Sequence, residues 1–378
     1  MNSRLNIVLF TIIILASCAE KSSDGSKVTF LVTGNVRGQL DPCGWKANPL
    51  GGLPRRATYI NQVKKSGVDP ILIDAGDSMF ESYYLLKGKE ASAKLRAKTV
   101  MEHTAKMGEY YYNVGVQDFS AGLDFIKQIK NTSNVYFLSS NIYDENTNNL
   151  LFNDHKILER DNLKIGIFGV ARELQTDLKG VRVENYIDVA AEKIQELRSQ
   201  VDLLVMLINA TKKDYDPYMK SFAGVDYIFS SLEASQTRPE IEQPLGKPYQ
   251  YQLGIQGKNI GRCDIYIVDK TKPIRDVSTQ MAMINYFSHR LNKLQEKDPK
   301  RKIEDIYKNS PNVLSTVERL RTGIESAKST LSKTVNRSSF KLIALDSSVP
   351  SEKAILQSVN EVLETCTTLD KKSAKNTP

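Results

Sequence analysis

The sequence predicts an α/β protein: a layered β-sandwich flanked by helices and followed by a mainly helical C-terminal region. Two observations carry this prediction. Between residues 28 and 270, short apolar runs that end in small or polar residues alternate with amphipathic helical stretches, whereas after about residue 275 apolar residues recur at helical spacing. Buried strands that alternate with helices are typical of α/β layers, in which the functional site lies at the carboxyl ends of the strands.

The elements of the first part are short apolar strands and longer periodic helices. Strands are expected at 28–34 (VTFLVTG), 70–77 (PILIDAGD), 164–170 (KIGIFGV), 202–209 (DLLVMLIN) and 226–231 (DYIFSS). Helices are expected at 91–108, 122–130 and 188–200. We assign this part to one domain, residues 27–275.

The segment after residue 275 predicts two long helices. Six apolar residues at alternating spacings of four and three define the second helix: Val313, Val317, Leu320, Ile324, Ala327 and Leu331. An earlier helix carries Val277, Met281, Ile284, Leu291 and Leu294, and KDPKRK breaks the chain between the two. The simplest arrangement is a hairpin packed on itself or on the sandwich; a dimerising coiled coil is the open alternative.

The end of the chain completes this helical region, which we assign to residues 276–370. A strand is expected at 338–348 (SSFKLIALDSS) and a final amphipathic helix at 351–366. The polar ending at 371–378 predicts a disordered tail.

The N-terminus predicts export. One basic residue, Arg4, precedes an apolar run from Ile7 to Leu15. The run is shorter than the ~20 residues that a membrane span needs, and it is typical of a secretory signal. The following LASC resembles the bacterial lipobox, which implies a signal peptide at 1–17 and acylation of Cys18, palmitate included. An ordinary cleaved signal is the alternative.

Acylation of Cys18 would leave a polar, lipidated tether at 18–26 that anchors the protein to a membrane. Ala19 and Glu20 lack the Asp that often retains lipoproteins in the inner membrane of enteric bacteria. We therefore favour the periplasmic face of the outer membrane, in the bacterial cell envelope.

Composition excludes some functions. The formal net charge of +8 is spread among interleaved acidic residues, and no basic run with aromatic residues indicates a nucleic-acid surface, so no nucleic-acid partner is expected. Cys43, Cys263 and Cys366 match no zinc spacing, and no disulfide is assigned to them.

Several segments, taken in order, resemble the bacterial 5′-nucleotidase-like lipoproteins of the calcineurin-like metallophosphoesterase superfamily. They include GNVRGQLDPCGWKANPLGGLPRRATYI, ILIDAGDSMF, VGVQDFSAGLDF, LKIGIFGV and GIQGKNIGRCDIYIV, and the likeness covers roughly residues 27–270. It implies a metallophosphoesterase-type sandwich with two divalent cations that polarise a phosphoester and generate a hydroxide nucleophile. It does not reach the large nucleoside-recognising domain of true 5′-nucleotidases.

The resemblance also locates the metal-ligand positions, and most of them are degenerate. In chain order they are Asn35, Arg37, Asp77, Val116, Gln117, Asn209, Leu232 and Ala234. The family has Asp, His, Asn and four His at these positions apart from Asp77, which retains the bridging carboxylate. Arg has no lone pair to donate and is always cationic. The three histidines of the chain, His103, His155 and His289, fall at no motif position, and we expect them at the surface.

Two roles are open for Arg37. Its guanidinium could replace the metals as the partner of a buried Asp77, or it could point to solvent. With Arg55 and Arg56 on the nearby loop it could also bind an anion, because arginine holds phosphate bidentately; the alternative is that these are ordinary surface arginines paired with carboxylates.

These observations favour a membrane-anchored pseudoenzyme that acts by binding and has neither catalytic residues nor a cofactor. Its partner would be a small anionic ligand, an envelope protein or a second copy through the C-terminal helices. The alternative is an active phosphoesterase or 5′-nucleotidase with a remodelled Mn, Zn or Fe site. In a third reading, the C-terminal helices are the working part and the sandwich is a spacer.

Overall fold

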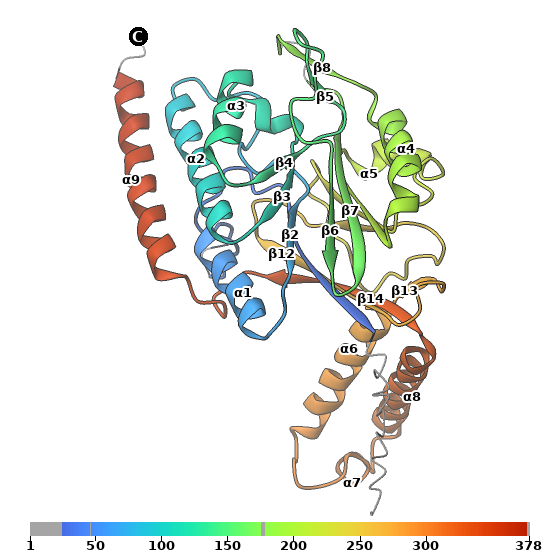
Figure 1. The fold of residues 1–378 in the computed structure, drawn as a ribbon. Helices are drawn as coiled ribbons and strands as arrows, with labels where there is room; N and C mark the ends of the chain where they lie inside the picture. The colour runs from blue at the N-terminus through green and yellow to red at the C-terminus, as the bar shows by residue number, and fades with distance from the viewer. Residues whose placement is uncertain (1–24, 46, 175–177, 376–378) are drawn as a thin grey trace, which may run out of the picture.

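The computed structural model describes residues 25–45, 47–174 and 178–375 (Figure 1). The predicted signal peptide, Cys18 and most of the predicted tether lie outside these residues. So do the last three residues of the predicted tail.

A seven-stranded sheet forms one layer of the sandwich, in the order β13-β14-β12-β1-β2-β3-β4. β1 to β4 are parallel neighbours, whereas β12 runs antiparallel to both β1 and β14. The bounds are β1 (Ser26–Thr33), β2 (Ile71–Asp74), β3 (Tyr110–Asn113), β4 (Tyr136–Leu138), β12 (Asn259–Ile267), β13 (Ile274–Asp276) and β14 (Asn336–Ala344).

A five-stranded sheet in the order β11-β10-β9-β7-β6 forms the second layer. Its bounds are β6 (His155–Arg160), β7 (Leu163–Ala171), β9 (Leu203–Asn209), β10 (Tyr227–Ser231) and β11 (Tyr249–Gln252), and a separate pair joins β5 (Ile142–Asp144) to β8 (Val181–Val183). Every residue of β9 and β10 is buried, which explains why these strands read as continuous apolar runs.

Helices cover both outer faces of the sandwich. Figure 1 shows α1 (Leu53–Lys65), α2 (Glu90–Lys106), α3 (Leu123–Thr132) and α9 (Lys353–Lys375) on one side, and α4 (Tyr186–Leu197) and α5 (Lys212–Tyr215) on the other. The 3₁₀ helices are η1 (Val116–Phe119), η2 (Arg198–Gln200) and η3 (Asp216–Tyr218). The predicted α/β sandwich is therefore confirmed.

The region after residue 275 divides differently from the prediction. α6 (Ser278–Gln295), α7 (Ile303–Ile306) and α8 (Pro311–Lys333) form a hairpin that projects from the sandwich (Figure 1). β14 and α9 return to the sandwich: the ring of Phe340 stacks on that of Tyr251 with centroids 4.1 Å apart. A boundary at 275 therefore does not separate two packed units. Residues 371–375 of the predicted tail continue α9 instead.

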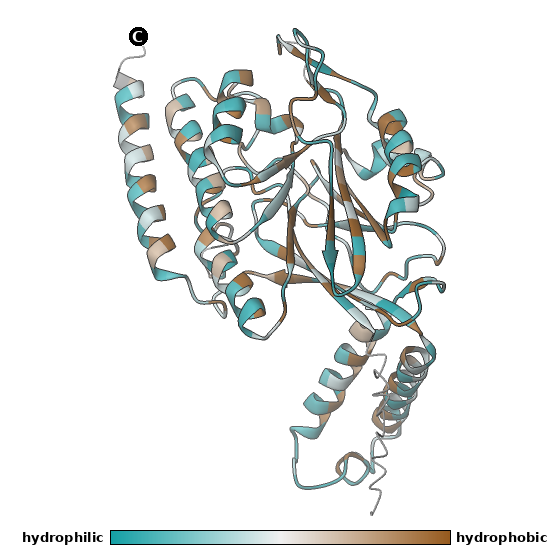
Figure 2. Cartoon of the chain, in the orientation of Figure 1, coloured by the Kyte–Doolittle hydropathy of each residue, from teal (hydrophilic) through white to brown (hydrophobic). Residues whose placement is uncertain are grey.

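α9 lies against α2 because its apolar stripe needs cover, as the alternating colours in Figure 2 indicate. Val359 and Cys366 are buried there, and Sγ of Cys366 contacts the carbonyl of Ser92 at 3.6 Å. Cys43, Cys263 and Cys366 are free thiols.

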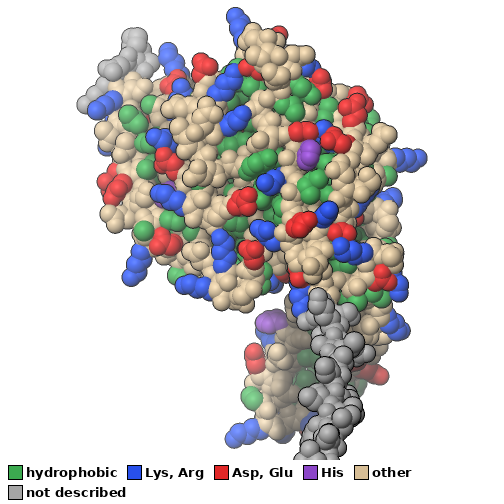
Figure 3. Space-filling view, viewed as in Figure 1, with side chains coloured by type: hydrophobic (Ala, Val, Ile, Leu, Met, Phe, Trp, Pro, Cys, Tyr) green, Lys and Arg blue, Asp and Glu red, His purple; other side chains and the backbone are tan. Residues whose placement is uncertain are grey.

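The surface carries mixed charge. Figure 3 shows basic and acidic side chains interspersed over the visible face. None of the helices within the described ranges is long and apolar enough to cross a membrane.

Candidate functional site

The candidate site lies where the carboxyl ends of β1, β2, β9 and β10 meet. Four of the expected ligand positions have positive φ there: Asn35 (52°), Arg37 (57°), Asp77 (59°) and Leu232 (79°). Positive φ is uncommon for residues other than glycine and clusters at functional loops. The backbone of these loops thus has the left-handed conformation at four positions, although three of the four side chains differ from the metal ligands of the family.

Both polar atoms of the Asn35 side chain form hydrogen bonds with backbone groups. Its Nδ2 donates to the carbonyls of Glu233 (3.0 Å) and Gly254 (2.9 Å), and its Oδ1 accepts from the amide of Leu232 (2.7 Å). The side chain is fully buried. Asn35 therefore connects the loop after β1 to the loop after β10 through hydrogen bonds.

Arg37 does not pair directly with Asp77. Its guanidinium donates to the carbonyl of Leu232 at 3.2 Å, and only the backbone amide of Arg37 reaches Asp77, at the carbonyl oxygen (3.1 Å). No side-chain hydrogen bond or ion pair joins the two among the described residues. The positive charge of Arg37 still lowers the pKa of Asp77 from a distance. The expected direct pair is therefore absent.

Asp77 is fully buried and has one free oxygen. Its Oδ1 accepts from the amide of Gln117 at 2.9 Å, whereas Oδ2 is buried without a hydrogen-bond partner. Burial raises the pKa of Asp77 to about 6, against the lowering effect of a hydrogen bond from Asn209. Burial thus makes the carboxyl group of Asp77 easier to protonate than that of an exposed aspartate.

Asp118 lies in the same pocket, although it is at none of the expected ligand positions. Its carboxylate accepts four hydrogen bonds, from Tyr112 Oη (2.6 Å) and the amides of Gly115 (2.8 Å), Met79 (3.1 Å) and Asp77 (3.2 Å). Burial and the charge of Asp77 raise the pKa of Asp118. The pKa of Asp118 rises to about 8, above that of Asp77, so the two coupled carboxyl groups take up a proton more readily than exposed aspartates do.

Asn209 and Gln117 now fill structural roles. Oδ1 of Asn209 accepts from the amide of Val116 (2.9 Å), and its Nδ2 donates to Oγ of Ser231 (2.6 Å). In the amide orientation that satisfies both of its groups, Gln117 donates to the carbonyls of Phe80 and Glu81, each at 3.1 Å. Gln117, at a position where the family has histidine, thus holds the β2–α2 loop over the site.

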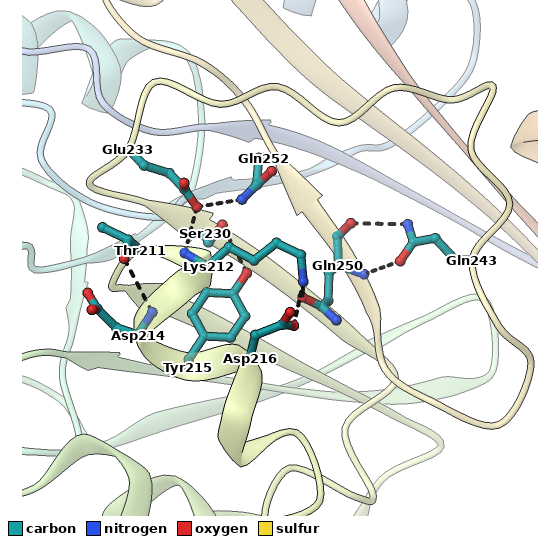
Figure 4. Close-up of polar contacts among 10 residues, drawn as sticks. All are labelled: Thr211, Lys212, Asp214, Tyr215, Asp216, Ser230, Glu233, Gln243, Gln250 and Gln252. Carbon is teal, nitrogen blue, oxygen red and sulfur yellow. Dashed lines mark hydrogen bonds and ion pairs between the residues drawn. The ribbon is translucent and has the colours of Figure 1, made fainter.

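The remaining ligand positions offer no donor atom. Val116 and Leu232 are buried apolar residues, and Ala234 is exposed. Beside them, the carboxylate of Glu233 accepts from the amide of Lys212 at 2.7 Å and from Gln252 (Figure 4). Within the described chain, this polar network occupies the loop in which the family has two histidines.

Arg55 and Arg56 do not join Arg37. Arg55 donates to the carbonyls of Pro49 (2.6 Å) and Leu345 (3.0 Å), and the buried Arg56 donates to Oγ1 of Thr104 (3.0 Å). Neither of them lines the cavity that Arg37 lines. The structure therefore gives both arginines structural contacts instead of the expected shared anion site.

Residues missed from the sequence include Tyr112, Asn113 and Ser231. The Asn113 amide donates to the carbonyls of Ala75 (3.1 Å) and Val170 (3.2 Å), bridging the two sheets, and Ser231 Oγ donates to Ala75 (2.6 Å). In the sequence, the only indication that these residues belong to the site is their position at or near the ends of strands.

The histidines are less exposed than expected. His103 is buried under α9, where its Nε2 lies 3.0 Å from Oγ of Ser358, because α9 covers this face of α2. His155 is half-buried beside Asp154, and His289 is exposed.

Asp154, His155 and Glu196 place one potential metal-ligand atom each within 4.8 Å of the others. Lys193, however, already contacts both Asp154 and Glu196 (2.7 Å to the latter). An ammonium thus neutralises this cluster.

Comparison with known proteins supports the resemblance. The chain is 27% identical over 261 residues to the 5′-nucleotidase of Vibrio cholerae, covering 65% of this chain and 44% of the relative. It is 26% identical over 203 residues to the 2′,3′-cyclic-nucleotide 2′-phosphodiesterase/3′-nucleotidase of Yersinia enterocolitica, covering 48% and 30%. The chain thus spans less than half the length of these relatives. No family model matches it.

Solved structures show the same fold. NAD nucleotidase of Haemophilus influenzae superposes with a TM-score of 0.52 at 17% identity, covering 66% of this chain and 57% of that one. A 5′-nucleotidase precursor of Thermus thermophilus gives 0.52 at 19%, covering 66% and 53%.

Proposed function

We propose that this chain, which has a metallophosphoesterase fold and is similar to 5′-nucleotidases, acts as a metal-free binding domain and does not hydrolyse phosphoesters. One observation carries the proposal: at the expected ligand positions other than Asp77 and Gln117, the side chains either lack a lone pair or already accept hydrogen bonds from the protein. Asn35 and Asn209 each accept a backbone amide through Oδ1. Arg37, Val116, Leu232 and Ala234 have no lone pair for a metal.

Asp77 alone keeps an unengaged carboxylate oxygen among these positions. Divalent cations take four or more good ligands, and a two-metal centre needs more than one carboxylate oxygen. The residues present therefore do not fit the pair of metal ions that the family implies.

The test is metal content by elemental mass spectrometry on the protein starting after Cys18, expressed with Mn, Zn and Fe, together with an assay of phosphoester hydrolysis. Near-zero metal and no hydrolysis are expected. One or two tightly held ions per chain, with turnover, would overturn the proposal and restore the alternative of a metal-dependent phosphoesterase. The retained Asp77 carboxylate is the observation in favour of that alternative.

We extend the proposal to a lipid anchor at Cys18, on the periplasmic face of the outer membrane. The chain enters β1 at Ser26, which pairs with Ile267 of β12. The preceding residue of β12, Tyr266, pairs with Arg337 near the start of β14. This end of the sheet is the root of the α6–α8 hairpin, and the candidate site lies at the other end of β1 (Figure 1). An anchor there would direct the site away from the membrane.

Labelling with a palmitate analogue tests the anchor. The wild-type protein should be labelled and sediment with outer-membrane vesicles, as should Cys43→Ser. Cys18→Ser should be unlabelled. Equal labelling of Cys18→Ser, or labelled protein found only with the inner membrane, would contradict the corresponding part of the proposal.

The α6–α8 hairpin is the proposed surface for a second copy of the chain. Ser278 is the only buried residue of α6, while Met281, Met283 and Tyr286 are exposed by 43%, 37% and 56%. Light scattering on wild type and on Met283→Ser/Tyr286→Ser should show loss of self-association in the variant, with Tyr218→Ser as an exposed control. A monomeric wild type would instead leave an envelope protein as the partner of this hairpin.

A further inference from the structure

A cavity of about 640 Å³ lies beside the candidate site, between the loop after β1, the β2–α2 loop, α2 and α9. This volume is in the range of small-molecule sites. α9 contributes Asp370 to the lining, so the return of the C-terminal helix to the sandwich adds a carboxylate to this cavity.

Three cations line this cavity: Arg37, Lys89 and Arg96. Arg37 donates to a carbonyl, and Arg96 is hydrogen-bonded to the thiol of Cys366. Among the described residues, none of the three forms an ion pair. Arg37 and Arg96 are half-buried and Lys89 is exposed. Cations without a carboxylate partner favour a bound anion, because charge-assisted hydrogen bonds are the stronger ones.

The cavity also has an apolar side. Met79 and Phe80 are buried at its base, and Leu86 and Tyr84 are each 66% exposed at its rim. Exposed large apolar side chains beside unpaired cations suit a ligand with a charged head and an apolar body.

Two carboxylates line the cavity as well, Glu81 and Asp370. Glu81 is exposed, and Oδ1 of Asp370 is buried without a hydrogen-bond partner. Three cations against two carboxylates leave a positive balance, and Asp370 could accept a hydrogen bond from a hydroxyl group on the ligand.

We propose that this cavity binds an amphipathic anion, whose phosphate or carboxylate head contacts Arg37, Lys89 and Arg96 and whose apolar chain lies on Leu86. The inference rests on the proposed binding role of the domain. It differs from the anion site considered in the sequence because Lys89 and Arg96 accompany Arg37 here, in place of Arg55 and Arg56.

Calorimetric titration of the full-length protein after Cys18 with monomeric decyl phosphate tests the inference. Decyl phosphate should bind at least about tenfold more tightly than inorganic phosphate or decanol, since both halves of the ligand contribute. Lys89→Gln/Arg96→Gln should weaken the binding of decyl phosphate about tenfold or more. Lys87→Gln, which removes a nearby cation outside the cavity, should not.

Leu86→Ser provides a second test, and because Leu86 is exposed, its substitution should not disturb folding. It should weaken decyl phosphate and leave inorganic phosphate unchanged. Equal affinities for decyl phosphate and decanol, or no effect of the Lys89/Arg96 change at unchanged melting temperature, would overturn the inference. Metal content separates this result from the parent proposal: a metal-free protein that does not bind decyl phosphate loses only this ligand class.

Discussion

The backbone amide of Asp77 donates to Oδ2 of Asp118 at 3.2 Å, so two fully buried carboxyl groups share one pocket. Asp118 accepts three further hydrogen bonds, whereas Oδ2 of Asp77 accepts none. A proton shared by these two groups thus reduces the negative charge buried in the pocket.

This arrangement predicts a pH dependence of stability. The pKa of Asp77 is raised from 3.8 to about 6 in the folded state, so its stabilising contribution is full below pH ~4 and is lost as pH rises through about 6. The loss amounts to about 3 kcal/mol. Urea unfolding at pH 4 to 7.5 should show a larger loss for the wild type than for Asp77→Asn, in which Asp118, whose pKa is also raised by burial, still titrates. The exposed Asp124→Asn should behave as wild type, and parallel curves for wild type and Asp77→Asn would contradict the assignment.

Restoring the expected ligands should restore metal binding, because the loop backbone keeps positive φ at Asn35, Arg37, Asp77 and Leu232. The variant combines Asn35→Asp, Arg37→His and Val116→Asn with histidine in place of Gln117, Asn209, Leu232 and Ala234. It should hold Mn or Zn through dialysis, measured by elemental mass spectrometry. The matched control keeps Arg37 and should bind at least about tenfold more weakly, since the guanidinium repels a dication. Failure of the restored variant, if folded, would show that the loops no longer fit metals.

Gly115 is required by close packing at the site. A Cβ there would lie 2.2 Å from Oδ1 of Asp77 and 2.6 Å from its backbone nitrogen. Gly115→Ala should therefore lower the free energy of unfolding by about 3 kcal/mol, as overpacking does at the upper end of its range. Gly122→Ala, at positive φ with open space around it, should cost only about 1 kcal/mol. Similar midpoints in urea for the two variants would refute this reading.

The docking of α9 should weaken in acid. Burial lowers the pKa of His103, so its contribution is present above the unfolded pKa of ~6.5 and is lost as pH falls through the folded pKa. Hydrogen exchange across α9 should accelerate at pH 5 relative to pH 7.5, after correction for intrinsic rates. His103→Gln should abolish the difference, while the exposed His289→Gln should keep it. An α9 with equal protection at both pH values would argue against this role.

The sequence determined the sandwich well because its strands are buried on both faces: apolar runs such as 202–209 leave few other solutions. It was less informative about α9 and β14. Their amphipathic pattern indicates that one face is covered, but it does not identify the element that covers it. The pairing of β14 with β12 joins segments about 80 residues apart, which local sequence does not indicate.

The sequence by itself determined which side chains stand at the positions where the family has its metal ligands, since residue type alone decides whether a side chain has a lone pair to donate. Only the tertiary structure decided what those positions do instead. Asn35 joins two loops, Arg37 donates to Leu232, and Asp77 shares its pocket with Asp118. Such roles depend on distances of about 3 Å between residues up to 200 positions apart, which local sequence does not encode.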